Sequence, residues 1–257
     1  AIDENGYTFN ARTELFQNRL SPIQINFMGF PSTSGANFID YIIADKIVIP
    51  DEFRKFYSEK IIYLPHSFMP SDNLKEISCK NTTREEFNLP KDAFVLCCFN
   101  KTYKISLIEF DIWMRILNKI ENSVLWLLES NELAMKNLNK EAIKKGVNPK
   151  RLIFAKKIPI SEHLERHKHA DLFVDTFNYN AHVTANDSLW AGLPVVTKEG
   201  KQFAARVSSS LLNSIDLNEL ITKNNDDYEK VILELALNKN KLSKIKEQLS
   251  INRLKMK

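Results

Sequence analysis

The segment 170–197 constrains the fold of this chain more than any other. It contains a short apolar run at Leu172–Val174, a polar loop, a stretch of helical character that begins near Thr184, and a second apolar run at Pro194–Thr197. This is the order of a buried parallel strand, a crossover helix and the next parallel strand. The loop of such a unit collects free backbone N–H groups and the positive end of a helix dipole, so phosphate groups bind there. On spacing alone, an ordinary crossover with a capping threonine explains the segment equally well.

The same alternation of strands and helices continues along residues 91–225. Apolar runs begin 20 to 30 residues apart, which is the spacing of strand–helix units, and each run is nearly all apolar, as buried parallel strands are. The runs are Phe94–Phe99, Val124–Leu128, Leu152–Phe154, Leu172–Val174 and Val195–Val196. The pattern predicts an α/β fold with one doubly wound, Rossmann-like lobe over 91–225.

Two helices between these strands have clear end signals. Ser106 and Glu109 form a capping box, and apolar residues then recur at helical spacing. A second helix is expected at Lys136–Lys145, where Gly146 and Pro149 stop it.

The first part of the chain is less regular. Residues 1–70 contain two buried runs, Ile23–Met28 and Ile39–Ile43, and a short helix at Glu52–Tyr57, which is too little for an independent lobe. We expect residues 71–90 to form a polar connector to the larger lobe.

Charge and composition argue against several classes of protein. The 36 basic and 32 acidic residues leave a net charge of +4, and much of the excess lies in 226–257, which we expect to be a C-terminal helix and basic tail. Because this tail has no aromatic residue after Tyr228, a solvated helix face is favoured over a nucleic-acid site. No apolar run approaches the roughly 18 residues of a membrane span. The three cysteines, Cys79, Cys97 and Cys98, give no disulfide framework, which favours a reducing compartment, the cytoplasm.

Four stretches together resemble one known family. Residues 175–197 resemble the nucleotide-sugar-binding signature of the O-GlcNAc transferase and Spindly-like glycosyltransferases, which reads close to D-T-F-P-Y-N-(A/G)-H-T-T-x-x-D-(A/S)-L-W-A-G-L-P-V-V-T in bacterial members. The other stretches are GFPSTSGANFIDY at 29–41, CFNKTYKI at 98–105 and AARVSSSL at 204–211. The resemblance runs from about residue 5 to about residue 228.

This resemblance implies a fold and a reaction. The fold would be of the GT-B type, with a complete C-terminal Rossmann-like donor lobe and part of the N-terminal lobe. The activity would be inverting transfer of GlcNAc from UDP-GlcNAc to Ser/Thr hydroxyls of a protein or peptide, without a metal or other cofactor. The remainder of the N-terminal lobe, the acceptor-positioning histidines and aspartate, and the helical repeats of family members would lie outside this chain. We therefore expect the isolated chain to bind nucleotide and to turn over poorly.

The family motifs also imply the site residues. Lys104 would contact the diphosphate, for which a compact ammonium charge is suited, and His182 would act beside it as the second catalytic residue. The other implied contacts to the nucleotide sugar are Lys101, Ile158, His163, Arg166, Val183, Thr184 and Asp187, with Met28, Gly29 and Pro31 approaching from the facing lobe. Asp187 would accept hydrogen bonds from the ribose, and His163 and Arg166 would flank the base.

Departures from the family pattern leave alternatives open. Val183 replaces a threonine of the usual His-Thr-Thr, Ile160 stands in place of a lysine, and Lys101 in place of a glutamine. The donor could therefore be GDP-fucose or UDP-glucose, or the chain could be a catalytically impaired module that binds nucleotide sugars. A dinucleotide-dependent dehydrogenase is disfavoured because no G-x-G-x-x-G occurs.

A metal site is a weaker interpretation of the histidine-rich segment 162–169. His163 and His167 share a helix face, but Leu164 stands where the zinc protease signature needs glutamate. We expect no metal here and expect His167 and His169 to be exposed.

Overall fold

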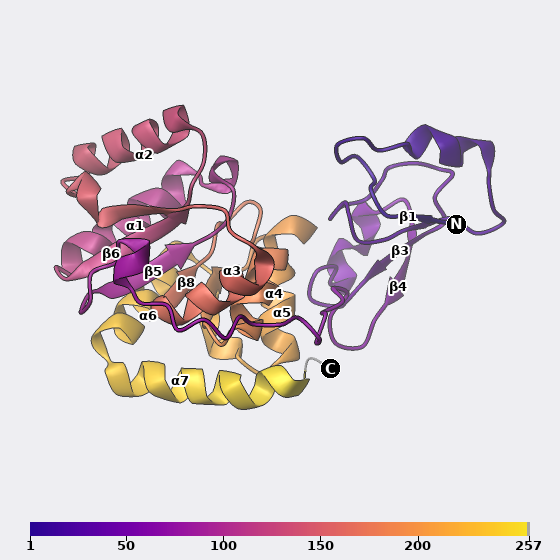
Figure 1. Ribbon diagram of the computed structural model, residues 1–257. Helices are drawn as coiled ribbons and strands as arrows, with labels where there is room; N and C mark the ends of the chain where they lie inside the picture. The colour runs from indigo at the N-terminus through magenta and orange to yellow at the C-terminus, as the bar shows by residue number, and fades with distance from the viewer. Residues whose placement is uncertain (256–257) are drawn as a thin grey trace.

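The computed structural model describes residues 1–255, which form two lobes that lie side by side, a smaller one of strands and 3-10 turns and a larger α/β one (Figure 1). Each lobe is built on its own parallel sheet. The smaller, N-terminal sheet has the strand order β1-β2-β3-β4, and the larger sheet has the order β10-β9-β8-β5-β6-β7. Two parallel sheets, one in each lobe, agree with the two-lobe arrangement that the sequence implies.

The larger lobe contains each strand that its apolar runs predict, with end shifts of up to two residues. The strands are β5 (Phe94–Cys98), β6 (Ser123–Leu128), β7 (Leu152–Ala155), β8 (Leu172–Val174), β9 (Val195–Lys198) and β10 (Ile221–Thr222). From β5 the chain adds β6 and β7 on one side, and then β8, β9 and β10 on the other. The strand order therefore reverses between β5 and β8, and ligands of doubly wound sheets bind at the carboxyl ends of the strands at such a point.

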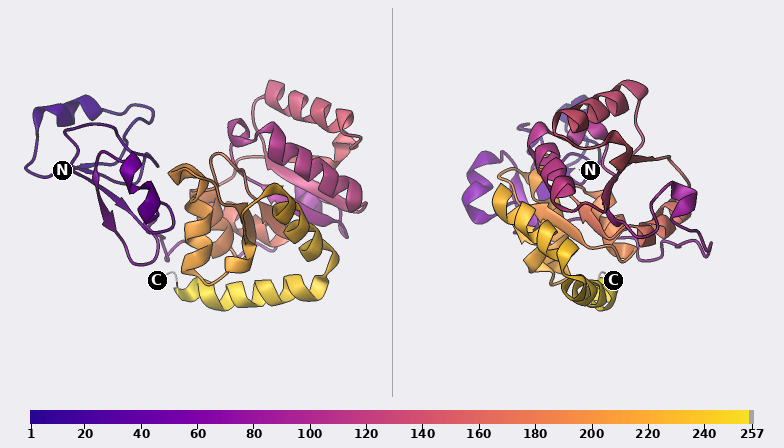
Figure 2. Two further views of the ribbon diagram at one scale, coloured as in Figure 1. Left: turned by 180° about the vertical axis from the view of Figure 1, so that it is seen from behind. Right: turned by 90° about the vertical axis from the view of Figure 1, so that its left-hand side faces the viewer.

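Helices cover both faces of this sheet (Figure 2). They are α1 (Leu107–Lys119), α2 (Glu132–Lys144), α3 (Ile160–Arg166), α4 (Val183–Trp190), α5 (Val207–Ser214), α6 (Asn225–Leu237) and α7 (Lys239–Asn252). The capping box before α1 is confirmed, since the backbone N–H of Ser106 donates to the Glu109 carboxylate at 2.6 Å. Helix α2 begins earlier than expected because the Asn131 side chain caps it, accepting from the backbone N–H of Ala134 at 2.8 Å.

The C-terminal segment is more than a solvated tail. Helix α7 buries Leu242, Ile245 and Leu249 against the larger lobe, and its half-buried Lys246 pairs with Asp171 at 3.8 Å. None of the helices within residues 1–255 is long and apolar enough to cross a membrane.

The N-terminal sheet consists of short strands: β1 (Ile2–Asp3), β2 (Ile25–Asn26), β3 (Tyr41–Ala44) and β4 (Lys60–Tyr63). The sequence did not predict β1 or β4, because the first has two residues and the second is only half buried and begins with a lysine. The helix expected at 52–57 is a 3-10 turn at Asp51–Phe56.

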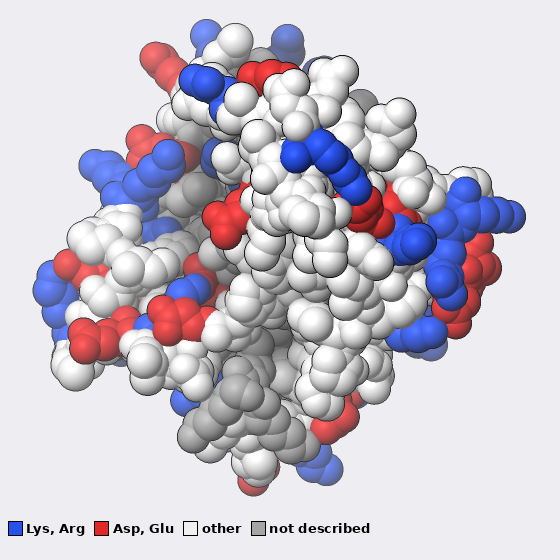
Figure 3. All heavy atoms as spheres, turned by 90° about the vertical axis from the view of Figure 1, so that its right-hand side faces the viewer, with Lys and Arg blue, Asp and Glu red and all other residues white. Residues whose placement is uncertain are grey.

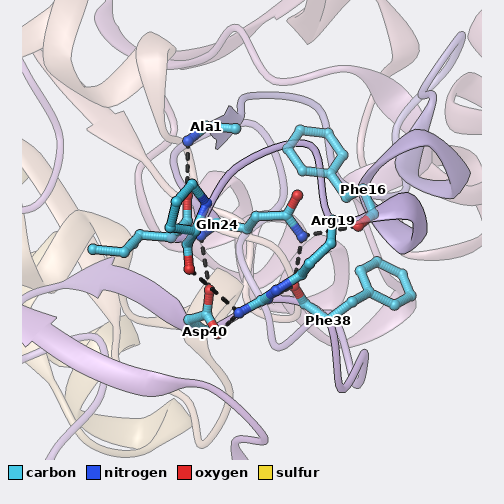
Figure 4. Close-up of polar contacts among 8 residues, drawn as sticks. Ala1, Phe16, Arg19, Gln24, Phe38 and Asp40 are labelled. Atoms are coloured by element: carbon cyan, nitrogen blue, oxygen red, sulfur yellow. Dashed lines mark hydrogen bonds and ion pairs between the residues drawn. The ribbon is translucent and has the colours of Figure 1, made fainter.

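Polar contacts rather than a large core order the start of this lobe (Figure 4). The Gln24 side-chain amide donates to the carbonyl oxygens of Phe16 at 2.8 Å and Phe38 at 2.7 Å. The Gln24 backbone N–H donates to Asp40 at 2.8 Å, and Arg19 pairs with the same carboxylate at 2.9 Å. Figure 3 views the molecule from the side of the N-terminal lobe, and this face has broad areas without charged side chains.

Hydrogen bonds fix the two lobes to each other. Asp45, at the end of β3, accepts from the Ser210 hydroxyl of α5 at 2.6 Å, and Arg206 donates from Nε to the Ile47 carbonyl at 2.5 Å. Phe68 packs edge-on against Phe203 at a centroid distance of 4.7 Å. These contacts set the width of the space between the lobes.

The connector 71–90 lies along the edge of the larger lobe, as Figure 1 shows. Thr82 donates its hydroxyl to the Glu165 carboxylate at 2.7 Å, and Arg84 pairs with Asp171 at 3.0 Å. The connector is therefore held to the lobe along its length and is not a free linker.

Candidate functional site

A cavity of about 410 Å³ lies between the lobes, at the carboxyl end of β5. The N-terminal lobe contributes Met28 and Gly29, and the N-terminus of α4 contributes His182, Val183 and Thr184. The remaining lining residues are Phe68, Met69, Phe99, Asn100, Lys101, Tyr103, Lys104, Leu128 and Tyr179. The strand-order reversal and the helix N-terminus thus meet in one space, where an anionic ligand is favoured.

Lys104 carries the central positive charge of this cavity. Its ammonium donates to the Asn180 carbonyl at 3.1 Å and lies 3.9 Å from the centre of the Tyr179 ring. Burial lowers the pKa of Lys104 to about 8, and the nearby Asp175 carboxylate only partly offsets this. A lysine that has lost water in this way gains most from an anionic ligand.

His182 occupies the N-cap position of α4 beside Lys104. Its ring stacks on Tyr179 at a centroid distance of 4.5 Å and an interplanar angle of 24°. Its Nε2 lies 3.1 Å from the Ala204 carbonyl, so a proton on Nε2 is donated there and Nδ1 is left as an acceptor. Burial lowers the pKa of His182 to about 3, so the ring is neutral at pH 7.

A buried polar network that sequence reasoning missed supports the loop before α4. The Asp175 carboxylate, at the end of β8, accepts from the backbone N–H of Thr176 at 2.8 Å and Ala181 at 2.6 Å and from the Thr197 hydroxyl at 2.7 Å. Burial raises the pKa of Asp175 to about 6. A polar residue directly after a fully apolar strand was the available signal.

Asn100 joins this network to the cavity. Its amide donates to the Thr176 hydroxyl at 2.8 Å, and its oxygen accepts from the Thr184 hydroxyl at 2.6 Å. The ends of β5 and β8 and the start of α4 are therefore locked together, which orients the helix N-terminus toward the cavity.

A second cavity of about 650 Å³ adjoins the first along the carboxyl ends of β6 and β7. The two share Lys101, Tyr103 and Leu128, and the second also has Lys156 and Lys157 on its wall. The wall of the second cavity carries these lysines and one acidic side chain, Glu129. Both cavities are of the size that ligand sites have, and together they offer enough space for a nucleoside diphosphate.

The structure places the residues implied for the base beside this space rather than on its walls. Arg166 is 1% exposed, donates to the Lys156 carbonyl at 2.6 Å and to His163 Nδ1 at 2.5 Å, and covers the Phe99 ring at 4.7 Å. Burial lowers the pKa of His163 to about 3. Ile158 is half buried and lines neither cavity. Contact of His163, Arg166 and Ile158 with a base stays a prediction.

The expectation that His167 and His169 are exposed is wrong. His167 is buried, with Nδ1 at 2.6 Å from the His163 carbonyl and its ring edge-on to Phe99, and His169 packs against Phe87. The turn after α3 faces the sheet, so both rings lie inside. Within residues 1–255 no group of three or more His, Cys, Asp or Glu side chains is placed to hold a metal ion.

The remaining implied residues divide between the cavity wall and the protein interior. Met28 and Val183 are 47% and 56% exposed and line the cavity. Gly29 approaches another part of the backbone so closely that a Cβ would lie 1.8 Å from the Glu4 carbonyl oxygen. Pro31 and Asp187 are buried and line neither cavity, and Asp187 is paired with Lys75 at 2.6 Å.

The lowered pKa of Lys104 predicts a pH-dependent affinity for a diphosphate. The protonated ammonium binds an anion, so we expect UDP affinity to fall as pH rises from about 7 to about 8.5, with proton uptake on binding near pH 8. The terminal phosphate loses its last proton at a pKa of about 6, and the uracil N3–H ionises only at higher pH, so the ligand charge is nearly constant over this range. Calorimetry in buffers of different ionisation enthalpy measures both effects. Lys104→Arg keeps its charge and should flatten the profile, whereas a constant wild-type affinity would contradict the prediction.

Comparison with known proteins gives the same fold and one family. The family model "Glycosyl transferase family 41" matches residues 1–78 and 73–257. A probable UDP-N-acetylglucosamine–peptide N-acetylglucosaminyltransferase SEC of Arabidopsis thaliana is 37% identical over 98% of this chain, and a Caenorhabditis elegans UDP-N-acetylglucosamine–peptide N-acetylglucosaminyltransferase is 25% identical over 95%. This chain spans only 26% and 31% of the length of those two proteins.

Among solved structures, a mutant O-GlcNAc transferase of Thermobaculum terrenum superposes with a TM-score of 0.90 at 24% identity, covering 99% of this chain and 48% of that one. The structure of TarM superposes with a TM-score of 0.61 at 14% identity, covering 95% of this chain and 49% of that one. These likenesses confirm the GT-B fold. With the family model matched along the whole sequence, the chain belongs to glycosyl transferase family 41.

Proposed function

We propose that the protein containing this chain is a glycosyltransferase that moves GlcNAc from UDP-GlcNAc to a serine or threonine hydroxyl of a protein or peptide, with inversion at the sugar carbon and without a metal. The observation that carries the proposal is the convergence of Lys104, His182 and the N-terminus of α4 on one cavity between two lobes. The relatives' names state the donor nucleotide sugar and a peptide acceptor.

The chemistry required is stabilisation of a leaving diphosphate. The acceptor oxygen forms a bond to the sugar C1 while the C1–O bond to the phosphate breaks, and the electron pair leaves with UDP. The Lys104 ammonium and the first N–H groups of α4, which have no partner inside the helix, favour this negative charge. Such fixed donors can replace the role that a divalent cation has in other transferases.

The acceptor hydroxyl must also lose a proton, and the cavity wall offers no suitable base. Among residues 1–255, His182 is the only imidazole on the wall of the 410 Å³ cavity, and its pKa is about 3. No carboxylate of these residues lines that cavity, and Glu129 lies on the wall of the adjoining one. The base is therefore expected from another part of the protein or from the substrates, which fits the prediction that the isolated chain turns over poorly.

The surroundings of the site fit a larger, intracellular enzyme. Apolar side chains of the N-terminal lobe are exposed, among them Phe9 at 91% and Leu20 at 61%, and would pack against the remainder of that lobe.

The cysteines fit a reducing compartment such as the cytoplasm. Cys97 and Cys98 are buried free thiols, and Cys79 is an exposed free thiol.

Calorimetric titration of the folded chain with UDP and GDP, in EDTA, tests the donor site. We expect UDP to bind, GDP to bind more weakly, and His182→Ala to weaken UDP binding. Retention of UDP affinity in EDTA supports metal-independent binding. A preference for GDP would transfer the assignment to a fucosyl donor, and binding of neither nucleotide would contradict the proposal.

A further inference from the structure

A buried ion pair joins the connector to helix α4. The Lys75 ammonium lies 2.6 Å from Asp187 Oδ1, and the two side chains are 22% and 4% exposed. Two further hydrogen bonds hold the same segment: Trp190 Nε1 donates to the Lys75 carbonyl at 3.1 Å, and the Ser71 hydroxyl donates to Asn186 at 2.8 Å. The connector is therefore anchored to α4 at three points within residues 71–75.

This ion pair lies directly behind the cavity wall. Asp187 follows Thr184 by three residues on α4, and residues three apart share a helix face. Thr184 lines the cavity, and its hydroxyl belongs to the network with Asn100. A ligand seated against the start of α4 thus lies within one helical turn of the Asp187 carboxylate.

The carboxylate is held by one oxygen only. Asp187 Oδ1 accepts from Lys75, whereas Oδ2 accepts no hydrogen bond from any residue within 1–255. An almost fully buried carboxylate without a counter-charge is strongly disfavoured, and the Lys75 ammonium supplies that charge and restricts the rotation of the Asp187 side chain. An oriented acceptor oxygen beside a nucleotide cavity suits a hydroxyl donor.

We propose that Lys75 is a positioning residue for the donor nucleotide, which fixes Asp187 so that Oδ2 accepts from the ribose hydroxyls. This role rests on the proposed function, because it needs a nucleotide in the cavity. The connector is then part of the donor site as well as the link between the two lobes.

Discrimination between UDP and 2′,3′-dideoxy-UDP tests this role. The wild-type chain should bind UDP more tightly than the dideoxy ligand. Lys75→Met should weaken UDP binding about tenfold, the value of one hydrogen bond to a charged group, and leave dideoxy-UDP binding unchanged. Lys75→Arg, which keeps the charge, should retain most of the discrimination. Calorimetry supplies the affinities, and thermal denaturation verifies that each variant is folded.

Lys80→Met is the matched control, because this exposed connector lysine pairs with Glu162 of α3 at 2.9 Å and has no hydrogen bond or ion pair to α4 within residues 1–255. It should bind both ligands as the wild type does. If Lys75→Met unfolds the chain, Asp187→Asn keeps the side-chain shape and should lose the same discrimination.

Three results would overturn the role of Lys75. If Lys75→Met weakened the binding of both ligands equally, Lys75 would only stabilise the structure of the site. If Lys75→Met bound UDP more tightly, Lys75 would compete with the ribose for Asp187. Wild-type binding of both ligands with equal affinity would also exclude it, while leaving the proposed function intact. Binding of neither ligand by the folded wild type would instead overturn the proposed function, and this role with it.

Discussion

Replacing Lys104 by methionine is expected to weaken UDP binding by about 10- to 100-fold, which corresponds to the ~1.5–3 kcal/mol of a hydrogen bond to a charged group. Its ammonium is the half-buried positive charge of the cavity, and burial has already lowered its pKa to about 8. When no ligand is bound, the folded protein bears the cost of desolvating the Lys104 charge. Replacing Lys104 by methionine should therefore leave the thermal stability unchanged or raise it. Loss of affinity together with retained stability is typical of a functional residue.

Calorimetry and thermal denaturation of the same samples measure both quantities. Lys101→Met is the matched control, because Lys101 lines the same cavity but is exposed and has no hydrogen bond to the loop before α4 within residues 1–255. The loss of UDP affinity in Lys101→Met should be several-fold smaller than the loss in Lys104→Met. Equal losses for both variants would mean that the cavity attracts the ligand by net charge and not through a particular contact at Lys104.

Replacing Asp175 by alanine is expected to cause a large loss of stability, about 3–5 kcal/mol, because each buried donor left without an acceptor costs about 1–3 kcal/mol. The donors of Thr176, Ala181 and Thr197 would lose their acceptor inside the protein. Because these donors order the loop before α4, UDP binding should be lost as well. Chemical denaturation and calorimetry check the two effects, and Asp92→Ala, on an exposed turn, is the control.

The contribution of Asp175 to the free energy of unfolding should depend on pH in a definite direction. Burial raises the folded-state pKa of Asp175 to about 6 from an ordinary value of 3.8. The protonated form is therefore favoured by folding, so its contribution to stability is complete below about pH 4 and is lost as pH rises through about 6. Asp175→Asn should flatten this part of the profile. An unchanged slope between pH 4 and 7 would show that Asp175 titrates normally in the folded chain.

The sequence determined the framework of the larger lobe. Runs such as Leu172–Val174 are short, apolar and regularly spaced, and strands that are buried on both faces leave that pattern whatever surrounds them. The capping box at Ser106 and Glu109 was equally readable, because both partners lie within one helical turn. The loop before α4 was predicted as an anion site for the same reason: its residues are contiguous.

Sequence reasoning was weakest where local pattern and burial disagree. Strand β4 was missed because its sheet is small and its residues are half buried, so they alternate little in polarity. His167 and His169 lie in a polar, charged segment that is typical of an exposed helix, yet the turn after α3 packs them against Phe99 and Phe87. Burial of such side chains depends on what packs over them, and no local pattern contains that information.

Only the tertiary structure decided how distant residues combine in the site. Lys75 and Asp187 are 112 residues apart in the chain, and Asn100 meets Thr184 across 84. Asp175 became the centre of a network because β8 and β9 are neighbours in the sheet, which brings Thr197 to its carboxylate. The sequence by itself determined most strands and helices of the larger lobe and predicted an anion site at the loop before α4, because these properties depend on neighbouring residues. The ion pairs, buried hydrogen bonds and shifted pKa values of the site depend on packing between segments, and the folded arrangement alone specifies them.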